Sequence, residues 1–201
     1  MPLVLVVPAD LPVDNLQDFI KLLKDNPGKY DYGSAGNGTS SHIAAYLFSK
    51  MTGTDSAHIP YRGTGPVMTD LLAGRLTFVL DAPSIVAPYI ESGHLKPLAI
   101  ALPERLKTLP DVPTMEEAGL PGYEAYSWNA MWAPKGTPTD VLDKLHASLA
   151  NAMADKELSA QLEQAGLVTY EPMTREEVKT YMQEQYEKWV PLVKESGAQV
   201  E

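Results

Sequence analysis

The stretch Tyr32–His42, which reads YGSAGNGTSSH, has the residue types and spacing best suited to holding a small charged molecule. Its glycines alternate with small hydroxyl and amide side chains, and a helical pattern follows directly. Backbone N–H groups at a helix N-terminus are unpaired and carry partial positive charge, so small residues there let an anion approach. The stretch therefore predicts an anion site, although a plain strand–helix turn would need the same glycines. The candidate residues are Ser34, Ala35, Gly36, Asn37, Gly38, Thr39, Ser40, Ser41 and His42.

More specific motifs do not fit this stretch. A phosphate-binding G-x-x-x-x-G-K-[ST] loop needs a lysine where Thr39 stands, which removes the main support for nucleotide chemistry. The dinucleotide pattern G-x-G-x-x-G fails because Ser41 follows where a third glycine is required. A hydrolase elbow G-x-S-x-G fails because Tyr32 occupies its first glycine position. What remains is a neutral set of N–H and hydroxyl donors.

Two other function classes stay open. A hydrolase or transferase would use Ser34 or Ser40 as its nucleophile, and a triad of Ser34, His42 and Asp81 can be written without an elbow to support it. A ligand-free interaction domain is the other alternative. We expect no catalytic residue and no cofactor. We also expect no metal site, because the histidines have no ligand spacing; they are His42, His58, His94 and His146.

A second glycine turn, Gly63-Thr64-Gly65, precedes another helical pattern and follows Arg62. If both turns follow strands of one sheet, they lie at the same carboxyl edge, where open α/β sheets bind ligands. Asp81 ends an apolar strand at that edge. It could accept a hydrogen bond from a ligand or cap the helix that begins near Ser84.

The elements that would position these residues alternate along the chain as short apolar runs and helical patterns. This order predicts an α/β fold with a mainly parallel sheet. Helices are expected after caps at Asp14 and at Thr39 or Ser40, after the second glycine turn, over Pro83–Ser92, and after a capping box at Thr114. The expected strands are Leu3–Val7, Tyr30–Tyr32, His58–Tyr61, Leu76–Leu80, Lys96–Leu102 and Tyr126–Ala133.

The character of the chain changes after about Ala133. Thr137-Pro138-Thr139-Asp140 is predicted to start a helix, with Thr137 as its cap and Pro138 at the first helical position. Further helices are predicted over Glu157–Gln164 and from Arg175, and Pro191 should disturb the last of them. One further strand is predicted, and it covers Leu167–Tyr170. These helices offer large apolar faces with little sheet to cover them.

Composition excludes several classes. The 201 residues are 44% apolar and carry a formal net charge of −10 without a basic stripe, which argues against a nucleic-acid partner. The absence of cysteine excludes disulfides and thiol chemistry. No apolar run approaches the roughly 20 residues of a membrane span. No signal-peptide pattern is present in this chain.

Several blocks together resemble the substrate-binding proteins of tripartite tricarboxylate transporters, the Bug or TctC-like receptors. They are YGSAGNGTSSHIAAYLF, IPYRGTGPVMTDLLAGRL, LPDVPTMEEAGLPGYEAYSW and WAPKGTP. The resemblance implies a type II periplasmic-binding-protein-like fold with two lobes. It also implies a small carboxylate ligand, a membrane permease as partner and a periplasmic location.

The resemblance assigns roles to particular positions. Tyr32–His42 matches the ligand loop of lobe two, and Tyr61-Arg62-Gly63, followed by Thr64 and Gly65, matches a second binding block. Asp81 matches the acid that follows a family strand. Trp128, in the Ser-Trp pair where the chain crosses back to lobe one, is the remaining candidate.

The chain lacks the first-lobe P-[FY]-x-x-G-G loop of that family. The resemblance therefore leads us to expect an N-terminally truncated receptor. Lobe two would span residues 8–126, and partial lobe one would span residues 1–7 and 127–201. Such a chain is expected to bind its ligand weakly. The uncovered C-terminal helices are expected to favour a homodimer.

Overall fold

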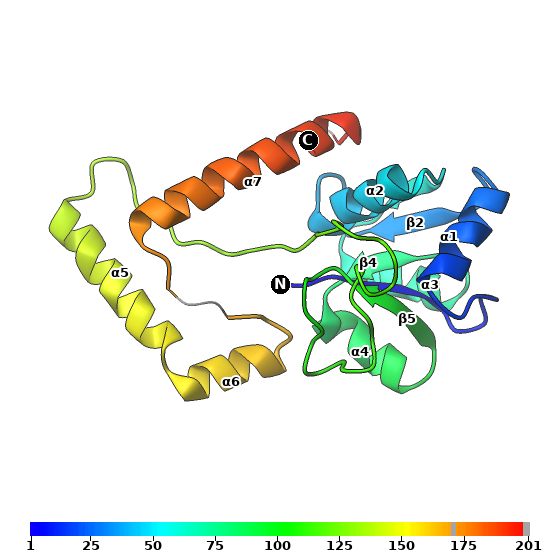
Figure 1. Cartoon of the computed structure of the whole chain (residues 1–201), viewed down its shortest axis with the longest axis horizontal. Helices are drawn as coiled ribbons and strands as arrows, with labels where there is room; N and C mark the ends of the chain where they lie inside the picture. The colour runs from blue at the N-terminus through cyan, green and yellow to red at the C-terminus, as the bar shows by residue number, and fades with distance from the viewer. Residues whose placement is uncertain (170–171, 199–201) are drawn as a thin grey trace.

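The computed structural model describes residues 1–169 and 172–198, in which an α/β unit is followed by three helices that extend away from it (Figure 1). The strands are β1 (Val4–Pro8), β2 (Asp31–Ser34), β3 (Ala57–Pro60), β4 (Val79–Asp81) and β5 (Leu95–Ile100). The helices of the unit are α1 (Leu16–Asp25), α2 (Ser40–Thr52), α3 (Thr64–Leu72) and α4 (Pro83–Glu91). The later helices are α5 (Thr139–Met153), α6 (Lys156–Gln164) and α7 (Arg175–Glu195).

The strands confirm the α/β class and a mainly parallel arrangement. β2 and β3 pair in parallel, and a parallel bridge between Tyr32 and Phe78 joins β2 to the chain just before β4. β1 lies between β4 and β5 and is antiparallel to both. Four strands therefore point the same way, and β1 alone opposes them. The sequence pattern did not predict the direction of β1.

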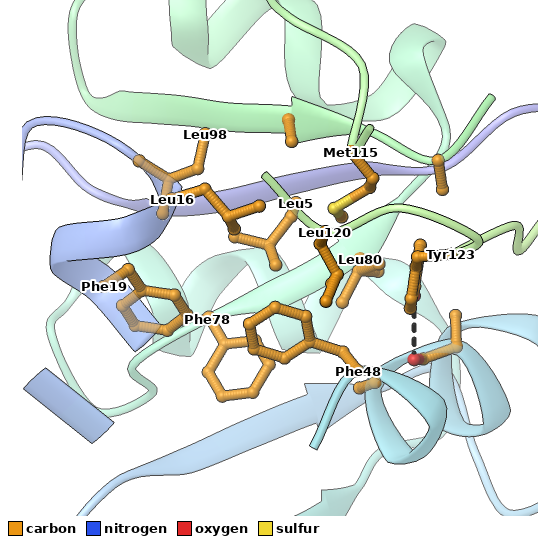
Figure 2. Close-up of a cluster of buried hydrophobic side chains, with 14 of the residues drawn as sticks. Leu5, Leu16, Phe19, Phe48, Phe78, Leu80, Leu98, Met115, Leu120 and Tyr123 are labelled. Atoms are coloured by element: carbon orange, nitrogen blue, oxygen red, sulfur yellow. Dashed lines mark hydrogen bonds between the residues drawn. The ribbon is translucent and has the colours of Figure 1, made fainter. Parts of the chain in front are cut away.

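β1 is buried on both faces, which explains its unbroken apolar sequence. Leu5 and Val7 belong to one hydrophobic cluster with residues of α1 and α2, and Figure 2 shows Leu5 close to the aromatic rings there. Val4 and Val6 belong to a second cluster, with residues of α3 and α4. The expected lobe boundary between residues 7 and 8 falls inside this strand. The division into lobes stays a prediction.

Two predicted helix starts are corrected. Pro138, not Thr137, is the N-cap residue of α5, which begins at Thr139 without a side-chain cap. Asn15, not Asp14, caps α1, and its side-chain oxygen accepts from the N–H of Asp18 at 2.9 Å. Thr39 caps α2 as predicted. Gly63 begins α3 with φ 105° and without any side-chain cap.

Two sequence predictions for the region before α5 are wrong. Tyr126–Ala133 forms no strand; Tyr126 makes only an isolated antiparallel bridge with Pro2. The box at Thr114 does form, since the N–H of Glu117 donates to its hydroxyl at 3.1 Å and the Glu117 carboxylate accepts its N–H at 2.8 Å. It opens a turn rather than a helix, because Gly119 with φ 88° follows at once.

The C-terminal helices leave the α/β unit and α7 returns to it beside α2 (Figure 1). An ion pair joins Lys50 of α2 to Glu195 of α7, and Trp189 packs against the first hydrophobic cluster. The prediction that Pro191 disturbs this helix is wrong. Proline removes a single amide donor near the end of a long helix, and the ordered turns continue to Glu195.

Residues 167–169 form no strand, and Tyr170 lies outside the described residues. Apolar side chains remain exposed on α5, where Leu145 is 48% exposed, and before it, where Trp132 is 66% exposed. Among the described residues, no helix is both long enough and apolar enough to cross a membrane.

Candidate ligand-binding site

The two glycine turns lie together at the carboxyl edge of β2 and β3. The N–H of Tyr61 donates to the carbonyl oxygen of Ser34 at 3.0 Å, and the N–H of Gly63 donates to that of Ala35 at 3.1 Å. A Cβ on Gly36 would lie 3.4 Å from the carbonyl oxygen of Tyr61, so the two turns approach closely there. The sequence prediction that both turns meet at one edge is confirmed by these contacts.

Within the first turn, several amides are occupied by the turn itself. The N–H of Gly36 donates to the hydroxyl of Ser34 at 3.2 Å, and the N–H of Ala35 donates to the hydroxyl of Ser41 at 3.1 Å. The N–H of Gly38 donates to Nδ1 of His42 at 3.1 Å. These three amides therefore shape the loop and do not face a ligand. Ala35, Gly36 and Gly38 are thus removed from the predicted amide donors to the ligand.

The amides left for a ligand lie in the first turns of α2 and α3. The backbone N–H groups of Ser40 and Ser41, and those of Thr64 and Gly65, make no hydrogen bond within residues 1–169 and 172–198. Pro66 has no N–H to offer. Two helix N-termini, fixed to each other by backbone hydrogen bonds, thus present paired donors at one sheet edge.

The exposed side chains around these amides add polar groups without a fixed partner. Arg62 and Asn37 are exposed, and the guanidinium of Arg62 enters no ion pair with any described carboxylate. Thr39, half-buried, donates its hydroxyl hydrogen to the carbonyl oxygen of Gly36 at 2.7 Å. Arg62 therefore supplies an available positive charge beside the start of α3.

His42 and His58 form a feature that the sequence analysis missed. Their rings stack with centroids 3.7 Å apart and an interplanar angle of 6°, and Nε2 of His58 lies 2.6 Å from the hydroxyl of Ser34. Burial, and then the charge of His42, lower the pKa of His58 to about 4. The pairing of β2 with β3 sets His58 opposite Tyr32, and knowledge of that register would have revealed the cluster.

Asp81 lies at the carboxyl end of β4 and is 7% exposed. Its carboxylate accepts the N–H of Ala82 at 2.8 Å, and burial raises the pKa of this carboxyl group above its usual value. Asp81 does not cap α4, because Ala82 is the N-cap residue of that helix and no side chain caps it. Its position at the shared edge is the expected one.

Trp128 is packed against Tyr181 of α7, with ring centroids 5.8 Å apart and an interplanar angle of 75°. No described contact joins it to either glycine turn. A cavity of about 180 Å³ opens between the start of α2 and α7. Its lining residues are Leu3, Gly38, Thr39, Ser40, Ile43, Ala125, Tyr126, Trp189 and Val193.

The site has no features of a metal centre. Across the described ranges 1–169 and 172–198, no three His, Cys, Asp or Glu side chains cluster in a way that could hold a metal ion. The donor set consists of amides, hydroxyls and one guanidinium, which suits an oxyanion.

Comparison with known proteins identifies the family. The model of the tripartite tricarboxylate transporter family receptor, TctC, matches residues 1–198. The chain belongs to this family. The family is described as a transporter receptor, which removes support from the hydrolase alternative.

One relative of known sequence matches most of this chain and is longer than it. A UPF0065 protein in the tcbD–tcbE intergenic region of Pseudomonas sp. strain P51 is 38% identical over 170 residues. The match spans 84% of this chain and 51% of that protein. The chain thus spans about half the length of the curated relatives it matches.

Solved TctC-like structures share the fold. Rpa4515 of R. palustris, solved with adipate, has 31% identity and a TM-score of 0.83. The match covers 98% of this chain and 66% of the Rpa4515 chain. MatC (Rpa3494) from Rhodopseudomonas palustris, with bound malate, has 28% identity and a TM-score of 0.81, covering 96% and 66%. The periplasmic binding protein BugD has 33% identity and a TM-score of 0.79, covering 98% and 67%. These neighbours support the type II periplasmic-binding-protein-like fold.

Proposed function

We propose that this chain is the ligand-binding part of a periplasmic receptor that captures a small organic acid for a tripartite tricarboxylate transporter. The observation that carries the proposal is the pair of helix N-termini with free amides at Ser40, Ser41, Thr64 and Gly65. A carboxylate oxygen accepts hydrogen bonds from such amides and is favoured by the positive ends of the helix dipoles. A membrane permease would then receive the ligand.

The electrostatics favour local recognition over long-range attraction. The net charge of −10 repels anions at a distance, so binding must depend on groups close to the ligand. The amides at the start of α2 and α3, together with the guanidinium of Arg62, are such groups. Adipate and malate, the ligands of two structural neighbours, are suitable first compounds to test.

The experiment removes a single amide without disturbing its helix. Ser40 is the first residue of α2, and Thr39 before it has φ −70° and ψ 162°, a conformation that a following proline tolerates. Ser40→Pro therefore deletes one donor, while Ser40→Ala deletes only the hydroxyl. Loss of one hydrogen bond to a charged acceptor should raise the dissociation constant about tenfold or more in Ser40→Pro.

A matched control exists at the start of α7, the end of that helix that lies away from α2 (Figure 1). Arg175 is the first residue of α7, and Thr174 before it has φ −63° and ψ 161°. Arg175→Pro should leave the affinity unchanged. Amide chemical-shift changes on titration with malate, adipate and citrate measure even weak binding. If no amide of Ser40, Ser41, Thr64 or Gly65 shifts with any of these acids, the proposal is wrong.

A further inference from the structure

A stacked pair of imidazoles lies directly behind the anion loop. His42 comes from the first turn of α2 and is 2% exposed, while His58 comes from β3 and is half-buried. The centroids of the two rings are 3.7 Å apart. Tyr32 of β2 stacks on His58 at 5.0 Å, so three elements converge on the pair.

A hydrogen bond from Gly38 fixes which ring nitrogen of the neutral His42 carries the proton. The N–H of Gly38 has a proton to donate, and Nδ1 of His42 lies 3.1 Å from it. Nδ1 must therefore carry a lone pair, which places the ring proton of the neutral imidazole on Nε2. Gly38 sits in the left-handed region with φ 73°, and this bond holds it in the turn that leads to the free amides of α2.

We propose that His42 is a positioning residue of the anion site, which orders the loop by accepting the Gly38 N–H and releases it when protonated on Nδ1. The inference rests on the proposed function of the two helix N-termini. Protonation would replace an acceptor with a donor that faces another donor. The loop then loses its turn, and affinity for a carboxylate falls as the pH falls below neutrality.

The ionisable groups on the neighbouring elements are either uncharged or bonded to other partners. From β2, Tyr32 is uncharged, since burial raises its pKa to about 12. From β4, the carboxylate of Asp81 is bonded to the N–H of Ala82. From α7, Glu195 pairs with Lys50. In the described part of the chain, no carboxylate forms an ion pair with either imidazole.

The direction of the pH effect follows from these contacts. Burial lowers the pKa of His42, and burial together with the charge of His42 lowers that of His58 to about 4. The unfolded or opened loop takes up protons near the ordinary histidine pKa of 6.5. The ordered loop is therefore most stable above pH 6.5 and loses stability as the pH falls below that value and through the lowered pKa of His42.

The experiment compares two substitutions at one position. In His42→Asn the side-chain oxygen replaces Nδ1 as an acceptor but does not titrate, whereas His42→Leu removes the acceptor. At about pH 7.5, His42→Asn should bind malate within about threefold of the original chain, and His42→Leu should bind at least about fivefold more weakly. Between about pH 7.5 and 5, the original chain should lose at least about fivefold more affinity than His42→Asn. Ionisation of the ligand itself cancels in this comparison.

Several outcomes would overturn the inference. Identical pH profiles for the original chain and His42→Asn would show that His42 does not control the loop. Tighter binding at low pH that His42→Asn abolishes would show that an imidazolium attracts the ligand instead.

The ligand-free protein supplies an independent readout. The Gly38 amide resonance should move with pH in the original chain and stay constant in His42→Asn, while amides of α1 stay constant in both. If no acid binds any variant but the Gly38 resonance behaves in this way, the carboxylate function fails and the positioning role stands. A Gly38 resonance that moves equally in both chains refutes the positioning role whether or not ligand binds.

Discussion

The backbone N–H of Gly63 donates to the carbonyl oxygen of Ala35 at 3.1 Å, which fixes the start of α3 to the loop that precedes α2. Gly63 holds this position with φ 105° and ψ 173°, a combination that only glycine adopts readily. The relative placement of the two helix N-termini thus depends on a residue without a side chain.

Gly63→Ala should therefore damage both stability and binding. The strained backbone should reduce the free energy of unfolding by about 1–3 kcal/mol, as measured by urea denaturation. The same substitution should weaken malate binding, because α3 would shift away from Ala35. Gly74→Ala, at a turn with φ 69° and open space around it, should reduce stability without changing affinity. Unchanged affinity in Gly63→Ala would contradict the coupling of the two turns.

The hydroxyl of Tyr123 anchors α2 by a hydrogen bond to its backbone. It donates to the carbonyl oxygen of Ala44 at 2.9 Å in a fully buried position, the dashed contact in Figure 2. Tyr123→Phe should lower the free energy of unfolding by about 1 kcal/mol. Tyr186→Phe, on a ring that is 63% exposed, is the control and should change little. Equal stability of both variants would show that the hydroxyl contributes nothing net.

Asp81 should reduce the stability of the ligand-free protein at neutral pH. Its folded pKa is raised by burial, so the folded state binds more protons than the unfolded state just above pH 3.8. Stability therefore falls as the pH rises through the folded pKa. Asp81→Asn keeps an acceptor for the Ala82 N–H and should raise the urea midpoint at pH 7 more than at pH 3. Asp10→Asn, at an exposed position, should show no such difference.

The exposed apolar side chains near α5 should drive self-association. Val141, Leu145 and Leu149, spaced four residues apart on α5, are 42%, 48% and 42% exposed, and Trp132 before the helix is 66% exposed. A face of several exposed apolar side chains marks an association surface, whereas a single one would not. Analytical ultracentrifugation should show a mass that rises with concentration, and Leu145→Lys should lower it. Leu72→Lys, on α3, is the charge-matched control. A constant monomer mass at about millimolar concentration would exclude the predicted homodimer.

Local signals predicted much of the fold. The Thr39 cap, the Gly63 turn and the first residue of α7 depend on neighbouring residues, and the structure confirms them. The direction of β1 and the failure of Tyr126–Ala133 to pair depend on contacts with distant segments. Strand partners of this kind leave no local pattern.

The site was predicted in outline and corrected in detail. The two glycine turns were recognised, but Ser34 and Ser41 shape the loop with their hydroxyls, and their side chains are buried. His58 was missed because its role appears only when β3 lies beside β2. Trp128 had been placed in the site by resemblance, and its described ring contact is with α7.

The bridge between Pro2 and Tyr126 brings together two points more than a hundred residues apart, and the N–H of Ser127 donates to the carbonyl oxygen of Met1 beside it. The chain thus enters and leaves the α/β unit at one place, marked by this bridge. A unit of this kind can be excised or transplanted as an insert, since a short linker would join its ends without crossing the core. Any body attached beyond this bridge is joined to the unit by two adjacent peptide segments and by α7, whose Trp189 packs against the first hydrophobic cluster.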